Sequence, residues 1–73
     1  MLTETLGARI RRLRAELGIG QERLAIEANV DQSGLSKLER GKDRRMSRPA
    51  LERIAGALGL NLEQLIDGTD YQA

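Results

Sequence analysis

The sequence predicts an all-α domain of five short helices. Apolar residues recur at spacings of three and four along most of the chain, which is the period of an amphipathic helix. Asn, Asp, Ser and Gly residues separate these periodic segments, at positions where helices commonly begin or end. No segment shows the strict alternation that is typical of a half-buried strand. We expect one domain over residues 1–73, with its core at about 3–66 and a loose tail at 67–73.

The first helix is expected over roughly residues 3–17. Thr3 is its candidate N-cap, and Gly18 is the candidate residue just beyond its C-terminus. One apolar stripe, which we expect to face the core, consists of Leu2, Leu6, Ile10, Leu13 and Leu17.

The second helix is expected from Gln21 to about residue 28, with an inner face of small and apolar residues. Asn29 follows it, and Asn tolerates the left-handed conformation that a tight turn requires. Val30 is then expected to pack inward. This short connection places the second helix directly before the third.

The third helix is expected over residues 32–40, with Asp31 as N-cap and Gly41 as stop. At about 100° per residue, Leu35 and Leu38 fall on one side of it. The opposite arc carries Gln32, Ser33, Ser36, Lys37 and Arg40.

The fourth and fifth helices follow a basic loop at residues 42–46. Ser47 can cap the fourth helix, and Pro49 is tolerated in its first turn. Asn61 and Gln64 have the spacing of a capping box at the start of the fifth. The apolar residues of these helices are Leu51, Ile54, Ala55, Leu58, Leu62, Leu65 and Ile66.

The composition excludes several classes of site. The chain has no cysteine and no histidine, which excludes disulfides, Cys/His zinc sites and catalysis by either residue type. No run approaches the roughly 18 apolar residues of a membrane span, and no signal peptide is visible. Tyr71 is the only aromatic residue, which argues against stacking on single-stranded bases. We expect a cytoplasmic protein that is not an enzyme and has no cofactor, metal, membrane contact or small-molecule ligand.

Charge is distributed unevenly along the chain. The net charge is only +1, but residues 9–48 hold 11 Lys/Arg and 6 Asp/Glu, a balance of +5. Residues 49–73 hold one Arg and four acidic residues, a balance of −3, and Glu4 supplies the remaining negative charge. This division suggests one face for a polyanion and another for a different partner. The alternative is a chance imbalance in a charge-rich chain.

The order of these segments resembles the phage repressor/Cro type of helix-turn-helix protein, also called the XRE family. The resemblance covers about residues 5–66 and is carried by "IRRLRAELGIGQERLAIEANVDQSGLSKLERGK" followed by "LERIAGALGLNLEQLI". It implies a compact five-helix lambda-repressor-like DNA-binding domain, with the helix-turn-helix at the second and third helices. The matching residues are Gln21, Leu24, Ala25, Val30, Leu35, Leu38, Glu39, Gly41, Ile54, Ala55, Leu58, Gly59 and Leu60.

The resemblance implies that the third helix reads base edges in a major groove. The chemistry of its side chains fits independently, because Gln pairs with adenine, Lys donates to guanine and Ser can serve either. The alternative is the solvated face of a surface helix. The expected base contacts are Gln32, Ser33 and Lys37, with Gly34, Ser36 and Asp31 as further candidates.

Phosphate contacts are expected at both ends of the motif. The resemblance places Gln21 on a phosphate, at a helix N-terminus that offers free N–H groups and a positive dipole end. Cations after the third helix can hold phosphates or reach a minor groove, unless they only form a solvated loop. The residues concerned are Arg40, Lys42, Arg44, Arg45 and Arg48.

Arg14 and Glu39 resemble a family pair that ties the first helix to the third; the alternative is two unpaired surface charges. Three residues depart from the family pattern. Gly20 replaces the usual Ser or Thr cap of the second helix, and Asp31 replaces a Ser or Thr before the third. Gly34 in mid-helix costs about 0.5–1 kcal/mol of helix stability.

The leading hypothesis is a small transcriptional regulator or repressor that binds double-stranded DNA sequence-specifically. A homodimer on a palindromic operator is expected, because a single recognition helix buries little surface. Leu62 and Ile66 are the candidate dimer residues, unless they only close the core. The rival reading is a protein-interaction module, such as an antitoxin or partner-binding helical domain, whose acidic C-terminal part binds a protein partner.

Overall fold

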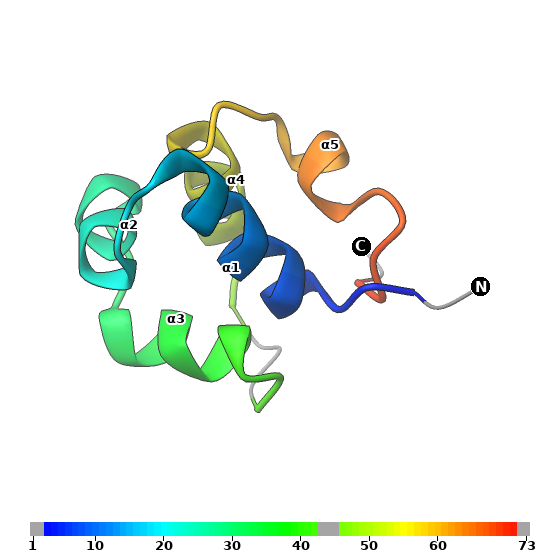
Figure 1. Ribbon diagram of the computed structural model, residues 1–73, viewed down its shortest axis with the longest axis horizontal. Coiled ribbons are helices and arrows are strands. Elements are labelled where there is room, and N and C mark those ends of the chain that lie inside the picture. Colours follow the sequence, from blue (N-terminus) through cyan, green and yellow to red (C-terminus); the bar gives the residue numbers. More distant parts are fainter. Residues whose placement is uncertain (1–2, 43–45, 72–73) are drawn as a thin grey trace.

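The computed structural model describes residues 3–42 and 46–71. These ranges contain five α-helices in the expected order (Figure 1). The helices are α1 (Leu6–Leu17), α2 (Gln21–Ala28), α3 (Gln32–Glu39), α4 (Arg48–Ala57) and α5 (Leu62–Ile66). The expected contacts Arg44 and Arg45, and Leu2 of the apolar stripe, lie outside the described residues. Within the described ranges, no helix combines the length and the apolar content that crossing a membrane requires.

Side-chain caps fix most of the helix starts where the sequence indicated them. Asp31 and Ser47 each accept the backbone N–H three residues further on, at 3.0 and 3.3 Å. Asn61 and Gln64 form the complete capping box at the start of α5. Gly20 offers α2 no side-chain cap, as expected from its missing hydroxyl. Local sequence therefore determines where α3, α4 and α5 begin.

Helix α1 begins later than expected, and the prediction of Thr3 as its N-cap is wrong. The side chain of Thr5 accepts the N–H of Ala8 at 3.0 Å. Glu4 is extended and forms an isolated parallel β-bridge with Thr69. The residues before Thr5 are therefore held by the C-terminal end of the chain, and this contact is invisible to a local reading of the sequence.

Residues 67–71 form part of the fold and are not the loose tail that their composition suggested. The backbone N–H of Asp70 donates to the carbonyl of Glu4 at 3.1 Å. The carboxylate of Asp70 accepts the N–H of Leu6, the first residue of α1, at 3.0 Å. Tyr71 is half-buried and packs against the core. Figure 1 shows this segment beside the start of α1.

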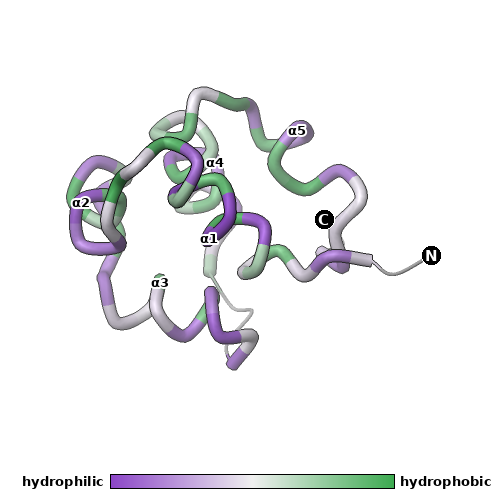
Figure 2. Tube along the Cα trace, in the orientation of Figure 1, coloured by the Kyte–Doolittle hydropathy of each residue, from purple (hydrophilic) through white to green (hydrophobic). Residues whose placement is uncertain are grey.

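One hydrophobic core draws on all five helices. Figure 2 shows hydrophobic stretches along α1, α4 and α5, whereas the trace of α3 is largely hydrophilic or neutral. Leu17, which the stripe assigned to the core, is 55% exposed because α1 ends there. The buried core residues are Leu6, Ile10, Leu24, Ala25, Ala28, Leu35, Leu38, Leu51, Ile54, Ala55, Leu58, Leu62 and Leu65.

Gly7 allows α1 to approach α3 closely. A Cβ at this position would lie 2.0 Å from the carbonyl oxygen of Leu38 and 2.8 Å from the Cα of Glu39. Any other residue would therefore push the start of α1 away from the end of α3. The apolar pattern gives no sign of this contact, because a glycine contributes nothing to a hydrophobic stripe.

Candidate nucleic-acid interface

Arg53 of α4 holds the turn between α2 and α3. Asn29 is left-handed, with φ 53°, as the sequence suggested. Arg53 of α4 donates from Nε to the carbonyl of Ala28 at 2.8 Å and from Nη2 to that of Asn29 at 3.4 Å. The guanidinium thus satisfies carbonyls at the end of α2 that have no partner within the helix. Sequence reasoning missed this role, although Arg53 is the one basic residue of the acidic C-terminal part.

Helix α3 lies along one edge of the molecule and presents a polar face to solvent (Figure 1). Leu35 and Leu38 are buried, as expected. On the other side Gln32, Ser33 and Lys37 are exposed. The further candidates divide: Asp31 is exposed and caps the helix, whereas Gly34 and Ser36 are half-buried.

The N-terminal end of α2 and the outer face of α3 border one open hollow, which is lined by Gln21, Gln32, Ser33, Ser36 and Arg40. These five residues were assigned separately to bases and to phosphates. The fold brings them to the same part of the surface. Hydrogen-bond donors and acceptors from two helices are therefore available to one ligand.

Gln21 has partners within the protein. Its Nε2 donates to Glu39 Oε1 at 3.3 Å, and its Oε1 accepts from Gln32 Nε2 at 3.5 Å. Gln21 thus links the first residue of α3 to the carboxylate at the end of the same helix. A phosphate contact from Gln21 stays a prediction.

The expected ion pair between Arg14 and Glu39 is present and nearly buried. Two parallel hydrogen bonds of 2.9 Å join the guanidinium to the carboxylate. The side chains are only 15% and 3% exposed. Arg14 also donates to the carbonyl of Ile19 at 3.1 Å. The hydrogen bond to Glu39 raises the pKa of Arg14, and the ion pair ties α3 to α1.

Most arginines of α1, α2 and α4 face carboxylates, whereas the cations at the end of α3 do not. The exposed pairs include Arg12 with Glu4 and Glu16, Arg23 with Glu27, and Arg48 with Glu52. Within the described ranges, Lys37, Arg40 and Lys42 form no ion pair, and neither does Arg11 on α1. Arg48, an expected phosphate contact, is therefore engaged by Glu52 at 3.4 Å.

The two candidate dimer residues differ in how much of each side chain is exposed to a partner. Leu62 is only 7% exposed and belongs to the core, so the core-closing alternative describes it. Ile66 is half-buried. The large apolar side chains exposed in the described part of the chain are Leu17 and Ile26, neither of them on α5.

Hydrogen bonding and positive charge are the chemistry that this face offers. Among the described residues, no group of three or more acidic side chains is placed to hold a metal ion. Glu39, a buried charged residue in the same region, is fully engaged by Arg14 and Gln21.

The chain matches the family model of the helix-turn-helix domain over residues 5–67. The immunity repressor protein of Bacillus phage phi105 is 37% identical over 62 residues, which cover 85% of this chain and 42% of the repressor. Control protein C.BamHI of Bacillus amyloliquefaciens is 34% identical over 64 residues, which cover 86% of this chain and 78% of that protein. The chain thus spans less than half the length of the phage repressor.

Solved structures of SinR from Bacillus subtilis show the same arrangement of helices. SinR in complex with DNA superposes with a TM-score of 0.80 at 33% identity, covering 86% of this chain and 100% of that chain. The complex of SinR with SinI gives a TM-score of 0.81, covering 86% of this chain and 61% of that chain. The resemblance to phage repressor/Cro-type proteins is confirmed, and the chain belongs to the helix-turn-helix domain family.

Proposed function

We propose that this protein is a small transcriptional regulator that binds duplex DNA with α3 in the major groove. The observation that carries the proposal is the outer face of α3, which combines exposed polar side chains with cations that have no carboxylate partner among the described residues. A helix fits the width of the major groove of B-DNA. The helix-turn-helix motif presents its second helix to that groove.

The cations at the end of α3 are suited to phosphates. Arg40 and Lys42 lie two residues apart, just beyond the C-terminal end of α3. Within residues 3–42 and 46–71, a polyanion would meet these two cations without displacing a carboxylate, unlike at Arg12 or Arg23. Phosphate contacts of this kind supply most of the sequence-independent affinity for DNA.

The side chains proposed to read bases lie along the exposed side of α3. Gln32 and Ser33 occupy its first turn, and Lys37 lies further along the same exposed side. Gln can bond the N6 and N7 atoms of adenine, and Lys can donate to O6 and N7 of guanine. Gln21 supports Gln32 through their hydrogen bond and is placed to reach a neighbouring phosphate.

The similar proteins support a regulatory role. One is an immunity repressor, one a control protein, and SinR has been solved in complex with DNA. We infer that this chain acts as a homodimer on a palindrome, with two α3 helices about 34 Å apart. Ile66 is the remaining α5 candidate for the dimer surface. This function places the protein in the cytoplasm and requires no catalysis.

A salt titration of binding to duplex DNA tests the proposal. The variants are Lys42→Ala and Arg23→Ala, each of which removes one exposed cation. We expect Lys42→Ala to weaken binding and to reduce the slope of log K against log salt by about 1. The matched control Arg23→Ala, on α2 and already paired with Glu27, should leave both unchanged. Equal effects of the two variants would show that Lys42, beyond the end of α3, makes no phosphate contact that Arg23 lacks.

A protein partner is the second candidate function. Ile26 is 71% exposed on α2, where it lines an open hollow with Glu22, Arg23 and Glu27. SinR, a relative of this chain, has been solved in complex with the protein SinI. Absence of duplex binding even at low salt would favour this function over the first.

A further inference from the structure

The segment at residues 69–71, here called the C-terminal clasp, caps the first helix. The carboxylate of Asp70 accepts the N–H of Leu6 at 3.0 Å. The backbone on either side is fixed by the bond from Asp70 N–H to the carbonyl of Glu4 and by the bridge between Glu4 and Thr69. The first N–H groups of a helix have no partner within the helix, so Asp70 satisfies one of them from the other end of the chain.

The same turn of α1 touches the end of α3. A Cβ on Gly7 would lie 2.0 Å from the carbonyl oxygen of Leu38. That carbonyl also accepts the N–H of Gly41 at 3.0 Å, in the left-handed turn that ends α3. The placement of Leu6 and Gly7 therefore fixes the turn from which Lys42 emerges.

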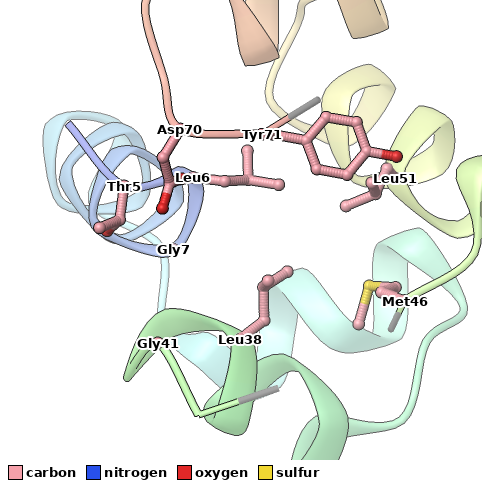
Figure 3. Close-up of a pocket in the computed structure, with 9 residues that line it drawn as sticks. All are labelled: Thr5, Leu6, Gly7, Leu38, Gly41, Met46, Leu51, Asp70 and Tyr71. Atoms are coloured by element: carbon pink, nitrogen blue, oxygen red, sulfur yellow. The ribbon is translucent and has the colours of Figure 1, made fainter. Parts of the chain in front are cut away.

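A small cavity lies between the clasp and the end of α3 (Figure 3). The side chains of Leu6, Leu51 and Tyr71 lie on one side of it, and those of Leu38 and Met46 lie on the other. Apolar packing across this cavity is incomplete. The side chains on its two sides therefore lack the dispersion energy that they would gain in direct contact. The hydrogen bonds of Asp70 consequently carry more of the attachment than they would in a filled interface.

The geometry points to Asp70 as a positioning residue for DNA binding. The C-terminal clasp holds the first turn of α1 against the end of α3, and this contact orients Arg40 and Lys42 toward phosphates. The inference rests on the proposed function, because it assigns to the clasp an effect on the same DNA-binding surface. Asp70 acts through Leu6 and Gly7.

Charge and position predict opposite effects of changing Asp70. Removal of its carboxylate makes the chain more positive, which on electrostatic grounds alone strengthens binding to a polyanion. Loss of the cap lowers the share of molecules in which the end of α3 is correctly placed, which weakens apparent binding. The direction in which the DNA affinity changes therefore distinguishes the effect of charge from the effect of position.

The experiment compares Asp70→Ala with Asp70→Asn in duplex binding, at a temperature where circular dichroism shows both variants folded. We expect Asp70→Ala to weaken binding about two- to ten-fold, the range that loss of one helix cap allows. Asp70→Asn keeps an acceptor oxygen and loses the charge, so its affinity should equal or exceed that of the wild type. The preferred DNA sequence should be the same for all three proteins.

Unchanged or tighter binding by Asp70→Ala would overturn the inference, as would equal weakening by both variants. If Asp70→Ala does not fold, Tyr71→Ala replaces it, because this change loosens the clasp without altering charge. Weaker binding by Tyr71→Ala supports the clasp, and wild-type binding by it refutes the clasp. If the wild type itself binds no duplex, the proposed function fails instead.

Discussion

Single residues decide how α3 is held on the domain. Glu39 is almost completely buried, and its carboxylate accepts two hydrogen bonds from Arg14 and one from Gln21. A buried carboxylate without its cation is strongly unfavourable, because desolvation penalises its charge. Arg14, Gln21 and Glu39 thus link α1, α2 and α3 at one point.

Replacement of Arg14 by Ala should cost about 3–5 kcal/mol of unfolding free energy, because it leaves the Glu39 carboxylate buried and unpaired. Urea denaturation checks this value. The control Arg23→Ala breaks an exposed pair with Glu27 and should change stability by less than about 1 kcal/mol. A similar loss of unfolding free energy in the two variants would contradict the claim that burial makes the Arg14–Glu39 pair more important for stability than an exposed pair.

Gly7 and Gly56 provide a matched pair of helical glycines. Gly7→Ala should destabilise the domain by about 1–3 kcal/mol, because its Cβ would overlap the backbone of Leu38. Gly56→Ala in α4 meets nothing within 4 Å and should stabilise it by about 0.5–1 kcal/mol. Thermal melts of the two variants should therefore shift in opposite directions, and a gain from Gly7→Ala would refute the close approach.

The ion pair was predictable from the sequence, whereas the glycine contact was not. Arg14 and Glu39 stand where the resembling family has a paired Arg and Glu, so the resemblance named both residues. The contact of Gly7 with Leu38 depends on how two helices cross. It is a property of tertiary packing, which no local pattern records.

At the scale of elements, the helix ends show which boundaries depend on local sequence. The side chains of Asp31, Ser47 and Asn61 each accept the backbone N–H of the residue three positions further along the chain. The sequence predicted all three of these caps correctly. The N-cap of α1 is Thr5 and not Thr3, because Glu4 pairs with Thr69 and Asp70 and is extended. Long-range pairing of this kind overrides the local preference of a threonine.

The N-terminal segment is held by an ion-pair cluster around Glu4. Arg9 and Arg12 bond its carboxylate at 2.9 and 3.0 Å. Arg9 also donates to carbonyls at the end of α5, those of Gln64, Leu65 and Asp67. Hydrogen bonds from Arg12 and then Arg9 lower the pKa of Glu4 to about 2.

The lowered pKa of Glu4 predicts how stability depends on pH. Its contribution is fully present above the unfolded pKa near 4.5 and is lost as pH falls toward the folded value of about 2. The difference in melting temperature between the wild type and Glu4→Gln should therefore shrink between pH 5 and pH 2. A difference that stays constant over this range would show that the carboxylate charge is not involved.

Gly34 lies within α3, at a position with room for a side chain. A Cβ there would meet only Asp31 Oδ2 and Met46 Cε, each at 3.8 Å. Gly34→Ala should raise the unfolding free energy by about 0.5–1 kcal/mol, because alanine favours the helix. Urea denaturation measures this change, and a destabilised variant would mean that the space beside α3 is smaller than the structure indicates.

At the scale of the whole molecule, the fold determines which basic side chains lie beside carboxylates, and the sequence alone does not show this. The sequence predicted a basic part and an acidic part. It could not show that Arg12, Arg23 and Arg48 would face carboxylates. It also could not show that Lys37, Arg40 and Lys42 would face none in the part of the chain that the structure describes. That sorting concentrates positive charge at the end of α3, which is the basis of the proposed DNA contact.

The central claim is that α3 reads base sequence, and selection from randomised duplex DNA with the wild type and Lys37→Ala tests it most directly. We predict that the wild type enriches a palindrome with half-sites about one helical turn apart. Lys37→Ala should change the preference at one position in each half-site, at a cost of about 1–3 kcal/mol for that base. Enrichment of no sequence, or identical preferences for the two proteins, would contradict the claim that Lys37 on α3 contacts a base.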